Sequence, residues 1–285
     1  MVKYAKGGDF VNEAITKASY PTINAFDFSI KYTETDRASH FFEIDLHTHR
    51  ECEIYINLSG DVSFMVEKRL YPLCRGDVII ARPGEYHHCV YHSDAKHALY
   101  WILFDANGNE ALFPRFFKRC HGEENLISPT EESKARLLQL CEKLLQKPLN
   151  PIGRYAAFFE LLEILESAKP EHRQTKTALP PDIASVLEYI DAHLSESLTR
   201  RTLSQIAYTS QSTLERRFSE ILGMHISTFI RKRRLSKAAL LLQQGRSVME
   251  AGLAVGYTDN SHFIKLFREN CGMTPFQYKK KYGDA

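Results

Sequence analysis

The chain has 285 residues, of which 44% are hydrophobic and 25% are charged, a composition typical of a soluble globular protein with room for two domains. No apolar run approaches the roughly 18 residues of a membrane span, and the first residues lack the apolar core of a secretion signal, so we expect neither a membrane protein nor a secreted one. The six cysteines are scattered without a Cys-x-x-Cys pair, which argues against a structural zinc site and predicts reduced thiols in a cytoplasmic protein.

The net charge of +2 is unevenly divided along the chain. Residues 1–168 hold 19 Lys and Arg against 24 Asp and Glu, whereas residues 182–285 hold 15 against 10. A basic C-terminal part indicates nucleic acid as its partner. An imbalance of this size over a hundred residues also arises by chance, so charge alone does not decide the matter.

Residues 20–105 are predicted to form β-strands. Short runs rich in β-branched and aromatic residues alternate with turn-forming segments such as SGD, RPGE and DANG. The runs are ECEIYINL, VSFMVE, GDVIIA and HALYWILF. Their spacing of about 10–12 residues is typical of an antiparallel barrel or sandwich.

From about residue 110 the apolar residues recur at helical spacing, which predicts helices in LFPRFFKRC, ESKARLLQLCEKLLQK and IGRYAAFFELLEILESA. The last two helices have apolar stripes that are too broad for an isolated surface helix. They either pack on the β domain or pair two copies of the chain. The polar, proline-bearing segment 169–181 is the predicted linker, and everything beyond it has a helical pattern.

The C-terminal part contains one sequence unit twice. FSEILGMHISTFIRK begins at Phe218, and FRENCGMTPFQYKKK begins 49 residues later at Phe267. Eight positions match at this offset, which makes an accidental repeat in a plain helical bundle a weak alternative. The matched pairs are Ser212 and Ser261, Leu214 and Phe263, Arg216 and Lys265, Phe218 and Phe267, Glu220 and Glu269, Gly223 and Gly272, Met224 and Met273, and Phe229 and Tyr278.

Each unit is preceded by a shorter predicted helix and a turn. Ser210 and Asp259 stand where an N-cap is needed, and Gly223 stands where the following helix should end. Helix, tight turn and helix is the motif whose second helix enters a DNA major groove. The intervening helix of about 18 residues spans roughly 27 Å. Such a rod can place both second helices in adjacent major-groove faces, which repeat every ~34 Å, so one chain is predicted to make two successive groove contacts.

Residues 182–285 resemble the DNA-binding domain of the AraC/XylS family of bacterial transcription regulators. The resemblance rests on SQSTLERRFSEILG, on RKRRLSKAALLL and above all on AVGYTDNSHFIKLFRENCGMTPFQY. It implies a sequence-specific regulator of transcription, more often an activator than a repressor, that works with RNA polymerase. Four positions depart from the family pattern: Ser204 and Gly252 where alanine is usual, Tyr208 where glycine is common, and Arg217 at a usually apolar position.

DNA sequence is read by side chains near the start of each second helix, and phosphates are held by Lys, Arg and hydroxyl groups around it. The predicted DNA-binding residues are Gln211, Ser212, Thr213, Glu215 and Arg216 in the first copy, and Asn260, Ser261, His262, Ile264, Lys265 and Arg268 in the second. Arg216 and Lys265 suit guanine, Gln211 or Asn260 could pair with adenine, and Ile264 could touch a thymine methyl group. Arg231, Lys232, Arg233, Arg234 and Arg268 are either phosphate contacts or a solvated face.

Two segments of the β domain, HTHRECEIYINLSG and GDVIIARPGEYHH, resemble the two motifs of the cupin barrel. The resemblance implies that His47, His49 and Glu53 of the first motif converge with His87 of the second. In metal-binding cupins such a set holds a divalent metal, and imidazole with carboxylate suits Fe, Mn, Ni or Zn. Three alternatives stay open: a pocket for a small organic effector without metal, a metal site, or structural histidines. His88 and His92 follow the motif and are predicted at the surface or the rim.

We therefore expect a multidomain α+β protein. Residues 1–168 are predicted to be a cupin-like antiparallel β-barrel with flanking helices that senses an effector and forms a homodimer, and residues 182–285 a domain of two helix-turn-helix motifs joined by a linker helix. The expected partners are double-stranded promoter or operator DNA, a small-molecule effector such as a sugar, and RNA polymerase. No cofactor is required, although a divalent metal is possible. A cupin metalloenzyme fused to a DNA-binding domain and an architectural DNA-binding protein without a ligand are the rival hypotheses.

Overall fold

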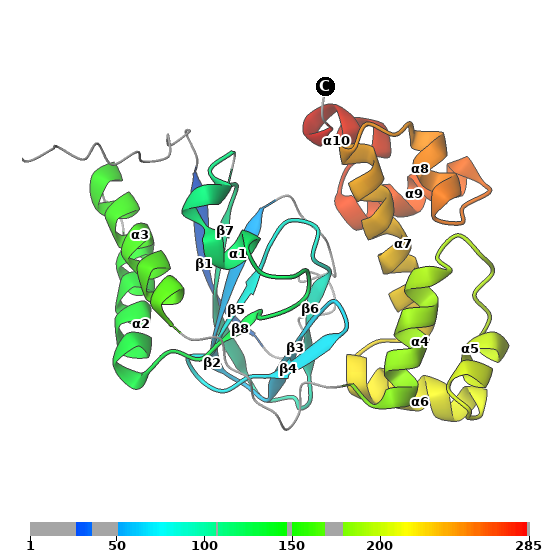
Figure 1. Ribbon diagram of the computed structural model, residues 1–285, viewed down its shortest axis with the longest axis horizontal. Helices are drawn as coiled ribbons and strands as arrows, with labels where there is room; N and C mark the ends of the chain where they lie inside the picture. Colours follow the sequence, from blue (N-terminus) through cyan, green and yellow to red (C-terminus); the bar gives the residue numbers. More distant parts are fainter. Residues whose placement is uncertain (1–26, 36–50, 107, 147–149, 169–178, 284–285) are drawn as a thin grey trace, which may run out of the picture.

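The computed structural model describes residues 27–35, 51–106, 108–146, 150–168 and 179–283 (Figure 1). These residues form a β domain followed by a helical domain, and each buries its own apolar cores. None of the described helices is long and apolar enough to cross a membrane.

The described strands form two antiparallel sheets. The strands are β1 (Phe28–Thr35), β2 (Cys52–Ser59), β3 (Val62–Val66), β4 (Arg69–Pro72), β5 (Val78–Ala81), β6 (His87–Tyr91), β7 (His97–Phe104) and β8 (Leu126–Ile127). One sheet has the order β1-β7-β2-β5-β8 and the other the order β4-β3-β6. Tyr55 and Leu99 of the first sheet pack against Phe64 of the second in one buried cluster, so the sheets enclose a common interior. The predicted antiparallel β fold is confirmed, and its described strands form two facing sheets.

Two long helices cover the outer face of the larger sheet (Figure 1). The chain passes from the 3-10 helix η2 (Glu110–Leu112) through α1 (Pro114–Phe117) to α2 (Glu131–Leu145) and α3 (Pro151–Ser167). Phe158 of α3 stacks on Phe28 of β1 with ring centroids 4.1 Å apart. The broad apolar stripes of these helices are explained at least in part by this packing.

The helical domain consists of α4 (Pro181–Ala192), α5 (Arg200–Ile206), α6 (Gln211–Leu222), α7 (Ile226–Gln243), α8 (Val248–Ala254), α9 (Asn260–Cys271) and α10 (Pro275–Tyr282). The N-terminal half of α7 packs with α4, α5 and α6, and its C-terminal half packs with α8, α9 and α10. The linker helix α7 therefore belongs to both helix-turn-helix units and joins them rigidly (Figure 1).

In both copies of the repeat, the second helix has a side-chain cap at its start and a glycine at its end. Ser210 accepts a hydrogen bond from the backbone N–H of Thr213, and Asp259 accepts from those of Ser261 and His262. Gly223 and Gly272 end their helices with φ of +71° and +69°, in the left-handed region that favours glycine.

The turns between the two helices of each motif differ by one residue. α6 and α9 begin 49 residues apart, whereas α5 and α8 begin 48 residues apart. The left-handed turn position is occupied by Gly256 in the second motif, with φ +85°, and by Tyr208 in the first, with φ +50°. The first motif therefore places a side chain where the second avoids one.

Three of the departures from the family pattern have a local cause. Arg217 pairs with Asp182 of α4, 2.9 Å away, so its charge is balanced at a usually apolar position. A Cβ atom on Gly252 would lie 3.0 Å from a ring carbon of Phe263, so glycine allows a close approach of α8 and α9 that alanine would permit only if the ring shifted. Ser204 is buried and donates its hydroxyl to the carbonyl of Arg201.

Candidate DNA interface and effector site

The first recognition helix, α6, presents its polar N-terminal turn to solvent. Gln211, Ser212 and Arg216 are exposed and Thr213 is half-buried, whereas Leu214 and Phe218 face the core. This separation follows from helical periodicity, because apolar residues three and four positions apart share one face. The predicted reading face thus remains accessible.

Glu215 and Arg216, two of the predicted reading residues in α6, form ion pairs or hydrogen bonds with residues outside the N-terminal cap. Glu215 is half-buried and accepts hydrogen bonds from the backbone N–H of Ile226 and from Nδ1 of His225, at 3.3 and 2.9 Å. Its carboxylate therefore caps the start of α7. Arg216 lies 3.1 Å from Glu220, one turn further along the exposed face. Such a surface pair is worth well under about 1 kcal/mol, so it leaves the guanidinium available to DNA.

The second recognition helix, α9, repeats this arrangement. Asn260, Ser261, His262, Lys265 and Arg268 are exposed. Ile264 is partly buried and packs against the apolar core of the second motif, so less of it is available to touch a base.

The basic segment of α7 does not form one uniform face. Arg233 is held between two carboxylates, with Nε 2.8 Å from Asp191 and Nη1 3.1 Å from Glu67. Its guanidinium also lies over the ring of Tyr86, 4.3 Å from the centroid. Arg233 was expected to touch a phosphate or lie on a solvated face, and neither is correct, because it connects the helical domain to the β domain.

Inside the β domain, Glu53 of β2 meets His87 of β6. Both side chains are buried, and the Glu53 Oε2 to His87 Nε2 distance is 3.2 Å. Burial lowers the pKa of His87, but the Glu53 carboxylate together with the carbonyl and the charge of Glu85 outweighs this effect, so the pKa of this imidazole lies above its ordinary value. The pair brings a donor and an acceptor together between the sheets, which suits hydroxyl-rich ligands.

A second polar group lies beside this pair. The hydroxyl of Tyr55 is 2.5 Å from Nε2 of His97, and Nδ1 of His97 is 3.3 Å from the hydroxyl of Tyr91. Burial raises the pKa of Tyr55 well above its ordinary value, so its phenol remains a neutral hydrogen-bonding group. Cys89 adds its thiol, 3.8 Å from the Tyr55 hydroxyl. The sequence analysis missed His97, because it belongs to neither cupin motif.

His47 and His49 lie outside the residues that the structure describes. Of the four predicted ligands, the structure therefore places only Glu53 and His87, and it brings them together. Within the described parts of the chain, no three His, Cys, Asp or Glu side chains form a group suited to a metal ion.

Strand β6 forms a wall between this interior and the helical domain. Because successive strand residues point to opposite faces, His87, Cys89 and Tyr91 point toward Glu53, Tyr55 and His97. His88 points the other way and lies 3.1 Å from the carbonyl of Leu222, at the C-terminus of α6. His88 was expected at the surface or rim, and this is wrong, because the helical domain covers it.

The same surface of the β domain buries further residues against the first helix-turn-helix motif. Met65 of β3 and Tyr86 belong to the apolar core of that motif, and the Tyr86 ring meets Phe229 edge-on at 5.5 Å. We call the set Glu67, Tyr86, His88, Leu222, Phe229 and Arg233 the docking contact. Its members are up to 166 residues apart in sequence, and no local pattern pairs them, so sequence analysis could not find it.

Comparison with known proteins identifies a family match in each of the two domains. Residues 29–162 match the family described as the AraC-like ligand binding domain, and residues 203–281 match a helix-turn-helix domain family. The arabinose operon regulatory protein of Escherichia coli (strain K12) is 27% identical over 218 residues, which cover 73% of this chain and 73% of that protein. The uncharacterized HTH-type transcriptional regulator YisR of Bacillus subtilis (strain 168) is 25% identical over 269 residues, 88% of this chain and 90% of that protein.

A third relative is similar over a shorter stretch. The uncharacterized HTH-type transcriptional regulator YijO of Escherichia coli (strain K12) is 26% identical over 165 residues, 56% of this chain and 50% of that protein. The two family matches cover the β domain and most of the helical domain in turn. These matches agree with the double helix-turn-helix and the buried polar groups between the sheets. The chain belongs to the AraC/XylS family of transcription regulators, with an N-terminal effector-binding domain and a C-terminal DNA-binding domain.

Proposed function

We propose that the chain activates transcription in the cytoplasm when a small polar effector, such as a sugar or a related carbon source, binds between its two sheets. Glu53 and His87 provide a buried acceptor and donor there, and Tyr55 and His97 provide two more polar groups. The arabinose operon regulatory protein, similar over 73% of the chain, supports a sugar by its name. His47 and His49 are proposed to complete the effector site.

The observation that carries this proposal is the shared wall of β3 and β6. One face of the wall contacts the polar interior through His87, while the other contacts α6 through His88. An effector that displaces His87 therefore acts on the strand that holds the first helix-turn-helix motif. Such a ligand shifts the balance between docked and detached states only if it binds the two with different affinity.

The proposed active form is a homodimer that recruits RNA polymerase. Ile152 of α3 is strongly exposed, and Phe159 and Leu145 are also accessible on the helices that cover the β domain. These side chains offer apolar area for a second copy of the chain. A dimer would double the number of DNA contacts.

The effector can be sought by following the thermal unfolding of the whole chain against sugars, sugar acids and divalent metals, each with and without a chelator. A ligand at a hundred times its dissociation constant stabilises the folded state by about 2.7 kcal/mol. We expect a rise in the melting temperature with one sugar that persists in chelator. Glu53→Gln should abolish this rise, whereas Glu34→Gln, a change of an exposed carboxylate of β1, should leave it intact.

Other outcomes would contradict parts of the proposal. A rise seen only with a metal and lost in chelator would make the domain a metal sensor, with Glu53 and His87 among the ligands. Turnover of a substrate by the metal-loaded chain would make it an enzyme, against our proposal that it is none. Equal affinity for all DNA sequences, with and without each ligand, would make it an architectural protein.

The contact between this wall and the helical domain suggests a variant whose DNA binding no longer responds to the effector. Glu67→Arg removes the acceptor that the β domain offers Arg233 and places two cations together, so the β domain should detach without an effector. DNA affinity, measured by titration at fixed salt, should then be the same with and without the effector. A full response in this variant would show that coupling does not pass through the docking contact.

A further inference from the structure

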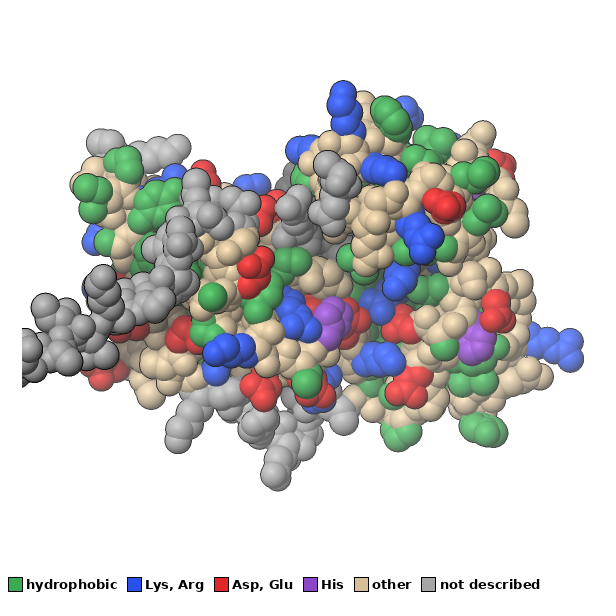
Figure 2. Space-filling view, turned by 45° about the horizontal axis from the view of Figure 1, so that its top comes forward, with side chains coloured by type: hydrophobic (Ala, Val, Ile, Leu, Met, Phe, Trp, Pro, Cys, Tyr) green, Lys and Arg blue, Asp and Glu red, His purple; other side chains and the backbone are tan. Residues whose placement is uncertain are grey.

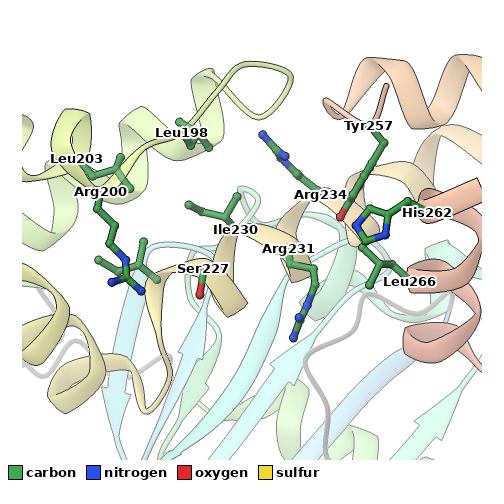
Figure 3. A pocket seen from close by; sticks show the side chains of 11 residues that line it. Leu198, Arg200, Leu203, Ser227, Ile230, Arg231, Arg234, Tyr257, His262 and Leu266 are labelled. Atoms are coloured by element: carbon green, nitrogen blue, oxygen red, sulfur yellow. The ribbon is translucent and has the colours of Figure 1, made fainter. Parts of the chain in front are cut away.

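A cleft of about 270 Å³ lies between the two helix-turn-helix motifs (Figure 3). Arg200 and Leu203 of α5 line one side, His262 and Leu266 of α9 line the other, and α7 forms the floor between them. Figure 3 shows the lining side chains between the helices, with the strands of the β domain behind them.

The lining is cationic. It carries three guanidinium groups, those of Arg200, Arg231 and Arg234, together with the imidazole of His262, and its described lining residues include no carboxylate. Figure 2 shows several Lys and Arg side chains, with acidic side chains among them, on the face of the helical domain that it presents.

Two of the three arginines are left partly unsatisfied by the protein itself. Arg231 is exposed, and among the described residues no acidic side chain pairs with it. Arg234 donates one nitrogen to the carbonyl of Glu196, but its buried Nε has no hydrogen-bond partner among the described groups. Arg200 has only a loose pair, 3.7 Å from Glu215. Incompletely paired cations that line one cleft favour an anionic ligand.

Helical periodicity explains why the cleft and the docking contact do not compete. Arg231 and Arg234 are three positions apart and share one face of α7, whereas Arg233 is turned about 100° from Arg234 and faces Glu67 and Asp191. Arg231 and Arg234 therefore line the cleft, whereas Arg233, on a different face of α7, belongs to the docking contact.

The anion is identified by where the cleft lies. His262 belongs to the recognition helix α9, and Arg200 lies beside Glu215 of the recognition helix α6. Between two major-groove contacts on one side of a duplex, the minor groove and its two phosphate strands face the protein. We infer that this cleft binds the phosphodiester groups of the DNA segment that lies between the two recognition helices, through Arg231 and Arg234 with Arg200 at its edge.

This inference rests on the proposed DNA binding, but it makes a separate prediction. Phosphate contacts release counterions, so each one adds about 0.9 to the slope of log K against log salt, without adding sequence preference. Arg231→Ala should therefore reduce that slope by about one on every sequence, and the Arg231→Ala, Arg234→Ala double variant by about two. Arg231→Lys should keep the wild-type slope, because it keeps the charge.

The test is a titration of the full chain at several salt concentrations. The chain is titrated with a duplex that it prefers, obtained by selection from random DNA sequences, and with a scrambled duplex. Arg75→Ala removes an exposed charge of the β domain and serves as the matched control, with an unchanged slope expected. Because Arg231 is exposed and makes no hydrogen bond or ion pair with the described residues, Arg231→Ala keeps the test interpretable even if Arg234→Ala unfolds the chain.

Two results would overturn the inference. An unchanged slope in Arg231→Ala would show that the cleft holds no phosphate. An unchanged slope with altered preference at the central base pairs would show that Arg231 reads bases instead. Loss of sequence preference in the wild-type chain would instead refute the proposed function, since the slope remains measurable on any duplex.

Discussion

At the scale of single residues, Tyr208 adopts a backbone conformation that is unfavourable for a residue with a side chain. It occupies the left-handed turn before α6 with φ +50°, and its side chain is 97% exposed. A left-handed conformation costs a non-glycine residue roughly 1–2 kcal/mol, and an exposed ring offers little packing in return. Strained residues tend to persist at functional positions, and this ring precedes the predicted DNA-reading turn of α6.

Tyr208→Gly should therefore raise the free energy of unfolding by about 1 kcal/mol, measured by denaturant titration. The matched change in the second motif is Gly256→Ala, where φ is +85° and the added Cβ would lie 2.9 Å from the carbonyl of Ser195. This variant should be destabilised. Lower stability in Tyr208→Gly would show that the tyrosine ring contributes more than its strain costs.

At the scale of elements, the two recognition helices depend on their N-caps. Asp259 accepts from the backbone N–H groups of Ser261 and His262, at 2.8 and 3.1 Å, and thereby orders the turn of α9 that carries the predicted reading residues. Removing such a cap costs typically about 1 kcal/mol.

Asp259→Ala should lower the free energy of unfolding by about 1 kcal/mol and speed hydrogen exchange in the first turn of α9. Asp259→Asn keeps an acceptor oxygen and should stay close to the wild-type value. If both variants lose the same stability, the charge of Asp259 near the helix N-terminus matters more than its hydrogen bonds.

Many of the helices and strands could be predicted from the sequence. The repeat aligned Leu214 with Phe263 and Phe218 with Phe267, and the structure buries all four in the cores of the two motifs, because apolar residues at helical spacing share one face. The one-residue difference between the turns was missed, because a fixed offset of 49 aligns α6 with α9 and hides the shift of α5 against α8. In the β domain the resemblance to the two cupin motifs predicted Glu53 and His87, whereas His97 lies in neither motif and was not predicted.

At the scale of the whole molecule, the prediction from sequence failed where the two domains meet. His88 and Arg233 resemble surface residues in their local sequence, and only the tertiary structure shows that each contacts the other domain. Burial, with smaller contributions from Lys232 and His87, lowers the pKa of His88 to about 3 in the docked state, although the hydrogen bond to the Leu222 carbonyl opposes this shift. A detached His88 would return to an ordinary pKa near 6.5.

Docking should therefore depend on pH with a definite sign. Because the docked pKa is the lower one, docking is strongest above pH 6.5 and weakens as the pH falls, by about tenfold per unit. The radius of gyration from X-ray scattering should rise between pH 6.5 and 5 in the wild-type chain. It should rise less in His88→Gln, whose amide donates to the Leu222 carbonyl without titrating. Identical curves for both proteins would rule His88 out as the titrating group.

The central claim is that one chain reads two successive major-groove faces with α6 and α9. Selection of preferred DNA sequences by the wild-type chain, by Arg216→Ala and by Lys265→Ala tests it most directly. Each substitution should cost about 1–3 kcal/mol at its own base pair and relax the preference there. The two affected positions should lie about 10 base pairs apart. Uniform weakening on all sequences by both variants, or two affected positions that lie side by side, would contradict this account.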